Sequence, residues 1–159
     1  MDDVLKILER DSRMSIDRIA TMTGKTEAEV REIIETAEKT GVIRRYKTVI
    51  DWEKAGRERV FAFIDVKVTP ARGVGFDDVA ERIYRFPEVH SVYLVSGACD
   101  LRVVVGGETM KQVAFFVAEK LSTIDRVQST STHFLLKKYK EDTDIFEEPV
   151  EDHRLAVSP

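Results

Sequence analysis

Residues 59–68 read Arg-Val-Phe-Ala-Phe-Ile-Asp-Val-Lys-Val, and the spacing of their apolar side chains decides the class of fold. Every second position holds an aliphatic residue: Val60, Ala62, Ile64, Val66 and Val68. This period of two predicts a β-strand with one buried face, because successive side chains of a strand point to opposite faces. The other face of the strand would carry Phe61 and Phe63.

The chain beyond this strand alternates between helical and extended patterns. We expect a helix over 76–84, a strand over 89–95, a turn over 96–99, a strand over 100–105, a helix over 110–121 and a last strand over 126–139. The order β-α-β-β-α-β predicts a ferredoxin-like sandwich over residues 59–140, with four antiparallel strands and both helices on one face.

The face of this sheet opposite the helices would expose Phe61 and Phe63. Apolar surface left in water costs roughly 25 cal/mol per Å², and a large exposed apolar patch usually marks an interface. We therefore expect at least a homodimer through this face.

The first 47 residues carry a helical period instead. Val4, Leu5 and Leu8 give a first helix its apolar stripe, and a short helix over 16–22 ends at Gly24. A third helix starts at the capping box Thr26-Glu27-Ala28-Glu29, buries Val30, Ile33, Ile34 and Ala37, and ends at Gly41. Two short helices joined by a glycine turn after a first helix are typical of a helix-turn-helix, although a plain three-helix interaction module shows the same periodicity.

The two patterns together predict an α+β chain with a helix-turn-helix domain over 1–47, a linker over 48–58 and the ferredoxin-like domain over 59–140. The acidic residues behind the formal net charge of −4 lie after this domain. Residues 141–159 hold one basic and seven acidic residues, whereas residues 1–50 hold ten of each. Such an acidic tail predicts a solvated extension. The alternative is that Ile145, Phe146 and Leu155 pack against a partner subunit.

Several kinds of protein are excluded by features that the sequence lacks. No apolar run approaches the roughly 20 residues of a membrane span, and the acidic start at Asp2 and Asp3 is no secretory signal, so a cytoplasmic location is expected. The single cysteine, Cys99, cannot form an internal disulfide, and the three histidines are far apart in sequence. No metal site, cofactor or catalytic residue is expected.

Six short motifs follow one another along the chain. They are Ile7-Leu8 with Ser12-Arg13-Met14-Ser15, Ile19-Ala20, Glu38-Lys39-Thr40-Gly41-Val42-Ile43, Pro87-Glu88-Val89, Val95-Ser96-Gly97-Ala98-Cys99-Asp100, and Val127-Gln128-Ser129-Thr130-Ser131-Thr132. With this order and spacing, the chain resembles the Lrp/AsnC family of feast/famine regulators over nearly all of residues 1–140. The resemblance implies a transcription regulator that binds double-stranded DNA and an amino acid or related metabolite, and whose dimers assemble into tetramers, octamers or larger discs.

The resemblance also implies an effector site near the glycine-aspartate loop. It carries over to Gly97 and Asp100 and, more loosely, to Ser96, Cys99, Leu101, Thr130 and Thr132. A glycine lets backbone groups approach a small molecule closely, and the Asp100 carboxylate could pair with an α-ammonium group. The alternative is a plain turn that holds Gly and Asp for turn chemistry alone.

The second helix of the helix-turn-helix is expected to contact DNA. Candidates are Lys25, Thr26, Glu27 and Arg31 at base edges, and Arg13, Arg18, Arg44, Arg45 and Lys47 at phosphates. The segment from Thr26 to Lys39 nevertheless holds five glutamates against Arg31 and Lys39, which disfavours approach to the DNA backbone.

This acidity keeps a second function open, namely a metabolite-binding oligomeric scaffold with little DNA binding. A third is a relative of the tetrapyrrole (siroheme) decarboxylases, which share the two-domain architecture. Such an enzyme would need a basic pocket containing histidine, and His133 is the one suggestive residue.

Overall fold

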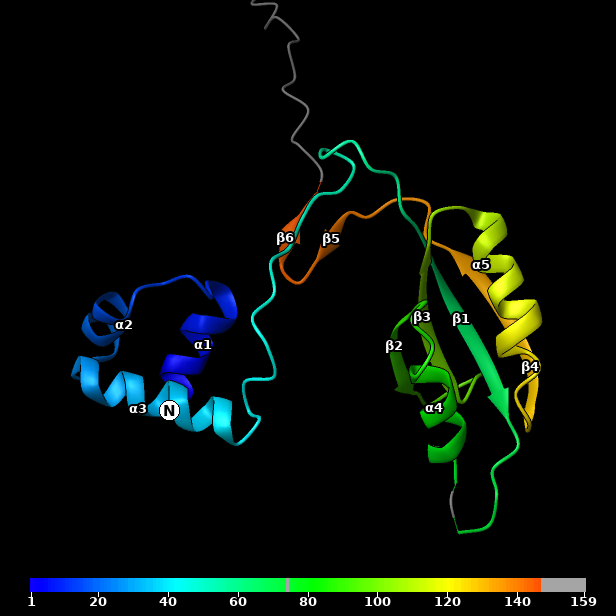
Figure 1. Ribbon diagram of the computed structural model, residues 1–159, viewed down its shortest axis with the longest axis horizontal. Helices are drawn as coiled ribbons and strands as arrows, with labels where there is room; N and C mark the ends of the chain where they lie inside the picture. Colours follow the sequence, from blue (N-terminus) through cyan, green and yellow to red (C-terminus); the bar gives the residue numbers. More distant parts are fainter. Residues whose placement is uncertain (74, 147–159) are drawn as a thin grey trace, which may run out of the picture. The chain divides into compact units, whose positions relative to one another are not determined.

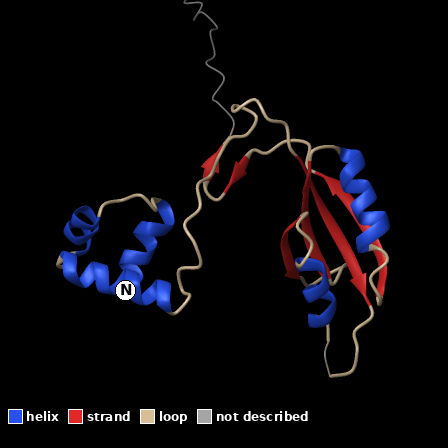
Figure 2. Ribbon diagram, viewed as in Figure 1, coloured by secondary structure: helices blue, strands red, loops and turns tan. Residues whose placement is uncertain are grey.

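The computed structural model describes residues 1–73 and 75–146. The chain divides into two compact units, with the boundary between Ile50 and Asp51. This boundary falls inside the stretch 48–58 that the sequence predicts to be a linker. Figures 1 and 2 show the three helices of the first unit and the sheet of the second.

The first unit is the expected trio of helices. They are α1 (Asp2–Arg10), α2 (Ile16–Thr23) and α3 (Glu27–Lys39). Val4, Ile19, Ala20 and Val30 are buried at its centre, so each helix contributes to one small core. Gly24 ends α2 with a left-handed φ of 65°, a conformation that costs glycine nothing.

The capping box at the start of α3 is confirmed. The Thr26 hydroxyl accepts from the Glu29 N–H at 3.2 Å, and the Glu29 carboxylate accepts from the Thr26 N–H at 2.8 Å. The pKa of Glu29 is lowered mainly by the hydrogen bond from the Thr26 N–H and also by that from the Thr26 hydroxyl, because both stabilise the ionised carboxylate. At the other end, Gly41 takes a φ of 73° and the Ile43 N–H bonds to the Ala37 carbonyl. Both ends of α3 are therefore set by local sequence.

The second unit confirms the expected β-α-β-β-α-β order. Its elements are β1 (Val60–Val68), α4 (Asp77–Tyr84), β2 (Val89–Leu94), β3 (Leu101–Gly107), α5 (Met110–Phe116) with the π-helical turn η1 (Val117–Leu121), and β4 (Val127–Phe134). The strands form one antiparallel sheet in the order β2-β3-β1-β4, so β1 and β3 are central (Figure 1).

The period of two in β1 determines which side chains enter the core. Ala62, Ile64 and Val66 are fully buried, together with residues of β3, α4, α5 and η1. The alternate positions, Phe61, Phe63, Asp65 and Lys67, therefore lie on the opposite face, which we call the open face of the sheet.

The last strand is shorter than the predicted 126–139. Arg126 has a φ of 72°, which is incompatible with a strand, and its guanidinium pairs with the Asp78 carboxylate. At the other end, Phe134 pairs with Ala62 near the start of β1. β4 is an edge strand and pairs with β1 alone. Its hydrogen bonding therefore stops close to Val60, where β1 begins.

The first residues of the acidic tail form a short hairpin that the sequence did not predict, and residues 141–145 remain exposed to solvent. Lys140–Glu141 (β5) and Asp144–Ile145 (β6) pair as a small antiparallel hairpin. Asp142 and Thr143, at its turn, both have positive φ, as the two central residues of a tight type I′ turn require. Residues 147–159, which include Leu155, lie outside the described residues.

The buried face of β1 gives a direct test of the fold. Ile64→Ala should lower the free energy of unfolding by about 2–5 kcal/mol, because it removes a fully buried side chain from a central strand. Urea unfolding of the wild type and the variant measures the difference. The control is Ser129→Ala, an exposed position on β4 that should change stability by less than about 0.5 kcal/mol. Equal losses for the two variants would contradict the assigned faces.

Candidate functional site

The outward surface of α3 is acidic, and its cations already have partners. Arg31 Nη2 lies 3.3 Å from Glu27 Oε2, and Lys39 Nζ lies 3.7 Å from Glu35 Oε2. Glu29, Glu32 and Glu38 are exposed on the same helix. A phosphate or base that binds Arg31 therefore does so beside the Glu27 carboxylate, which weakens the attraction of this helix for DNA.

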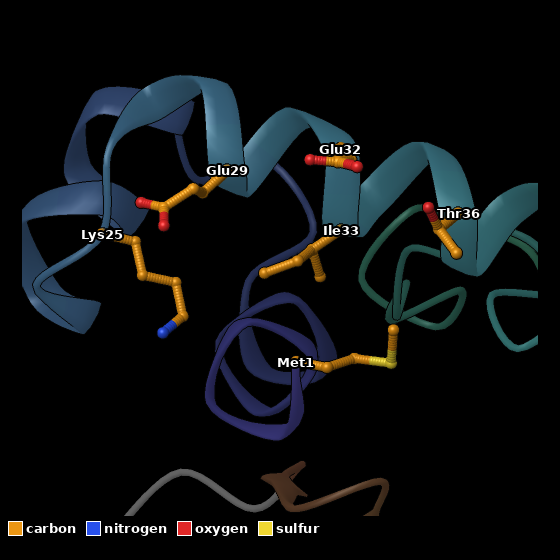
Figure 3. Close-up of a pocket in the computed structure, with 6 residues that line it drawn as sticks. All are labelled: Met1, Lys25, Glu29, Glu32, Ile33 and Thr36. Carbon is orange, nitrogen blue, oxygen red and sulfur yellow. The ribbon is translucent and has the colours of Figure 1, made fainter.

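Lys25 and Thr26, at the predicted base-reading end of α3, are also engaged locally. The Thr26 hydroxyl belongs to the capping box. Lys25 lines a shallow groove together with Met1, Glu29, Glu32, Ile33 and Thr36, as Figure 3 shows. Two carboxylates border this groove beside an apolar floor, so it is unsuited to a phosphate.

The basic segment after α3 has an anchor that sequence analysis missed. The Tyr46 hydroxyl donates to Glu38 Oε1 at 2.8 Å, and this tie holds the segment against the end of α3. Arg44 and Arg45, which precede Tyr46 in the chain, are exposed. Arg13, just before α2, and Arg18, in its first turn, are exposed as well. A tyrosine eight residues after a glutamate carries no sequence signal for such a bond, which depends on the turn at Gly41.

The turn between β2 and β3 holds the predicted effector residues Ser96, Gly97, Cys99 and Asp100. The Val95 N–H donates to the Asp100 carbonyl at 2.9 Å and closes the turn. Gly97 has a φ of 122°, and no atom lies within 4 Å of the place where its Cβ would stand. The glycine is therefore required for its backbone angle, while the space above it stays open.

Asp100 is the most constrained residue of this turn. Its N–H donates to the Val66 carbonyl at 3.0 Å, and its Oδ2 accepts from the Val68 N–H at 2.9 Å. Since Val66 pairs with Leu101, the first residue of β3, Val68 lies beyond the reach of that strand. The carboxylate therefore takes the place of a strand partner, and its other oxygen, Oδ1, lies 3.5 Å from Lys67 Nζ.

The remaining predicted effector residues do not join the turn within one chain. Leu101 is 1% exposed, so its side chain belongs to the core. Thr130 is in register with Val66 on the far side of β1, about 10 Å from β3 at two strand spacings, and its hydroxyl lies 3.2 Å from that of Ser122. Thr132 faces Ile64 further along β4.

The open face carries a polar cluster that the sequence did not reveal. Arg102 binds Asp65 through Nε at 2.8 Å and Nη2 at 3.2 Å, and His133 Nε2 lies 3.6 Å from the same carboxylate. The Arg102 guanidinium holds the pKa of Asp65 below its usual range. These residues come from three strands, so finding them needed the register of the sheet.

The apolar part of the open face is smaller than expected. Phe63 is 39% exposed and lies opposite Val104 on β3. Phe61 packs edge-on against His90 with ring centroids 5.3 Å apart and is partly buried. The expectation that both phenylalanines face water is therefore correct for Phe63 only.

Within residues 1–73 and 75–146, no cluster of His, Cys, Asp and Glu could hold a metal ion. Over the same residues, no helix is long and apolar enough to cross a membrane.

Comparison with known proteins identifies both units. Residues 3–44 match a winged helix-turn-helix DNA-binding family, and residues 61–145 match the Lrp/AsnC ligand binding domain. A DNA-binding module followed by a ligand-binding domain defines a ligand-responsive transcription regulator. The chain belongs to the Lrp/AsnC family of these regulators.

Two kinds of relative support this assignment. YugG, an HTH-type transcriptional regulator of Bacillus subtilis, is 56% identical over 99% of this chain and 95% of its own length. The fold is shared with the feast or famine regulatory protein of M. tuberculosis complexed with L-methionine, at a TM-score of 0.72 and 22% identity over 90% of this chain and 94% of that one. It is also shared with a Neisseria meningitidis regulator in complex with L-Met, at a TM-score of 0.71 and 21% identity over 94% of each chain.

The family settles the class of function. The chain is a DNA-binding transcription regulator whose C-terminal domain binds a ligand. The matched family is one of transcription regulators and not of enzymes, which disfavours the tetrapyrrole decarboxylase alternative.

The pairing of Arg31 with Glu27 leads to a test on DNA. Glu27→Gln should tighten binding to a DNA duplex by about two- to ten-fold at low salt, because it frees Arg31 and removes a negative charge near the phosphates. Fluorescence anisotropy with a labelled duplex measures the affinity, and the gain should shrink as salt rises. Glu9→Gln on α1 makes the same charge change elsewhere and serves as the control. Unchanged or weaker binding by Glu27→Gln would show that α3 does not approach the DNA.

Proposed function

We propose that this regulator responds to an amino acid bound at the turn between β2 and β3. The single observation that carries this is the Asp100 carboxylate, whose Oδ2 is held by the Val68 N–H at 2.9 Å while its Oδ1 meets Lys67 Nζ only at 3.5 Å. Its side chain is 20% exposed, so a bound ammonium group would be partly shielded from water. Charge-assisted hydrogen bonds of this kind are about twice as strong as neutral ones.

The two structural relatives that contain L-methionine support this class of effector. Ser96, Gly97 and Cys99 would line the site with Asp100 through the turn they share. Leu101, Thr130 and Thr132 would take part only through backbone atoms or from a second subunit, since neither threonine reaches the turn of its own chain.

In the first unit, we propose that two sets of side chains contact different parts of the DNA. Arg13, Arg18, Arg44, Arg45 and Lys47 would contact phosphates, while Arg31, Lys25, Thr26 and Glu27 would lie near base edges. Tyr46 would hold the basic segment in place through its bond to Glu38. DNA as the partner is consistent with the predicted cytoplasmic location.

We also propose that a second copy of the chain covers the part of the open face around Phe63, away from Lys67 at the other end of β1. Exposed Phe63 and half-buried Val104 lie opposite each other there, and burying their exposed apolar surface would stabilise a dimer. Assembly into tetramers or octamers would then bring several DNA-binding units together, and such multivalency raises avidity without new contacts.

One observation favours a second candidate function. The ion-paired, glutamate-rich surface of α3 suits a metabolite-binding oligomer that binds DNA weakly. If the protein does not bind the DNA upstream of its own gene at low salt, this alternative is favoured.

The effector site is tested by calorimetry with the twenty amino acids. One or more should bind the wild type, and Asp100→Asn should weaken binding by at least about ten-fold, because it removes the charge that faces the ammonium group. Asparagine keeps an oxygen for the Val68 N–H, whereas Asp100→Ala would leave that N–H unpaired and disturb the turn. The control is Asp125→Asn, an exposed position before β4. If a ligand binds wild type and Asp100→Asn equally well, the effector lies elsewhere.

The dimer is tested by light scattering after size-exclusion chromatography. At micromolar concentration the wild type should be a dimer and the Phe63→Asp variant a monomer, because an unpaired charge in an interface costs several kcal/mol. The matched control, Phe115→Asp, changes a 50% exposed phenylalanine on α5, away from the open face, and should stay dimeric. A wild type that is monomeric at this concentration would refute the proposal.

A further inference from the structure

Lys67 is a charged residue on the open face, placed there by the alternation of β1, and no part of the site described so far uses it. It is a lysine in a strand whose buried positions are all apolar, and it lies next to the proposed effector turn. Its Nζ faces Asp100 Oδ1 at 3.5 Å, well beyond the roughly 2.7–2.9 Å of a tight charge-assisted bond. The Lys67 side chain is 45% exposed, so this ion pair adds little to stability.

The two carboxylate oxygens of Asp100 play different parts. Oδ2 is held by the Val68 N–H, which fixes the carboxylate at the end of β1. Oδ1 meets only the loosely placed ammonium of Lys67 among the contacts described for this side chain. The turn therefore presents a fixed negative charge beside a positive charge on a flexible four-carbon stem.

Another cation on the same face, Arg102, is poorly placed to serve a ligand. Its guanidinium forms two hydrogen bonds with Asp65, at 2.8 and 3.2 Å, and this pairing raises the pKa of Arg102 further. A ligand carboxylate would have to break a bidentate pair to reach Arg102. Reaching Lys67 requires only that a loose contact separate.

We propose that Lys67 and Asp100 form a receptor for the zwitterion of an α-amino acid. In this arrangement Asp100 Oδ1 binds the α-ammonium and Lys67 Nζ binds the α-carboxylate. The ligand class is then an amino acid with both groups free, and esters, amides, N-acyl derivatives and simple amines are discriminated against. This inference rests on the proposed effector site at Asp100 and adds the partner of the carboxylate.

The charge balance favours this exchange. In the free protein Lys67 and Asp100 neutralise each other, so neither stands as an isolated charge beside the turn. Binding of the zwitterion breaks one loose pair and forms two, with no change in net charge. A ligand that lacks one of its two charges would leave Lys67 or Asp100 without a partner, and an unpaired, partly shielded charge lowers affinity.

The test combines changes in the ligand with changes in the protein. The probes are L-methionine, L-methioninamide and N-acetyl-L-methionine, since L-methionine is bound by two structural relatives. If the calorimetric scan selects another amino acid, its amide and N-acetyl derivative replace them. The proteins are the full-length wild type, Lys67→Met, Lys67→Arg and Asp100→Asn. Lys111→Met on α5 removes the same charge elsewhere and serves as the control.

The expected result is a specific loss of discrimination. Lys67→Met should weaken the binding of L-methionine by about two- to five-fold yet leave the binding of the amide nearly unchanged, since an exposed ion pair contributes up to about that factor. Lys67→Arg should restore the preference for the free acid, and Lys111→Met should behave as wild type. Asp100→Asn should remove the preference for a free amine over the N-acetyl derivative.

Three results would overturn the proposal in different ways. If Lys67→Met weakens acid and amide equally, Lys67 only supports the turn. If Lys67→Met tightens binding of L-methionine, Lys67 competes with the ligand's ammonium instead of binding its carboxylate. If no amino acid binds the wild type in the scan, the proposed effector site itself fails. Thermal unfolding of each variant confirms that the comparison is made between folded proteins.

Discussion

The alternation of side chains along β1 is the constraint on which the second unit depends. Ala62, Ile64 and Val66 enter the core, which forces Asp65 and Lys67 to the open face. A shift by one residue would exchange the two sets and bury a lysine and an aspartate. The same constraint that builds the hydrophobic core therefore places Lys67 beside Asp100 at the end of the strand.

The two units divide the function of the regulator between them. The first unit binds DNA, yet its α3 surface has paired cations and many glutamates, so a single copy would bind weakly. The second unit binds the ligand. A ligand changes DNA binding only if it binds one state of the protein better than another, and we propose that these states differ in assembly.

Local patterns in the sequence predicted most of the fold. The capping box of α3, the glycine ends of α2 and α3 and the period of β1 are all confirmed, because each depends on residues close together in the chain. The predicted end of β4 was wrong and the hairpin after it was not predicted, since they depend on where a partner strand stops and on the turn at Asp142 and Thr143.

The candidate site was only partly predictable for the same reason. Asp100 stood out through its turn motif, whereas Lys67 and the bond from Val68 became visible only through the register of β1 and β3. Likewise, Thr130 lies on the wrong side of β1 to join the turn in its own chain.

We propose that an amino acid bound at Asp100 controls DNA binding. The DNA upstream of the regulator's own gene is titrated with wild type and with Asp100→Asn, in the presence and absence of the selected amino acid. The amino acid should shift the titration of the wild type and leave that of the variant unchanged, whereas equal shifts in both proteins would show that Asp100 is not the control point.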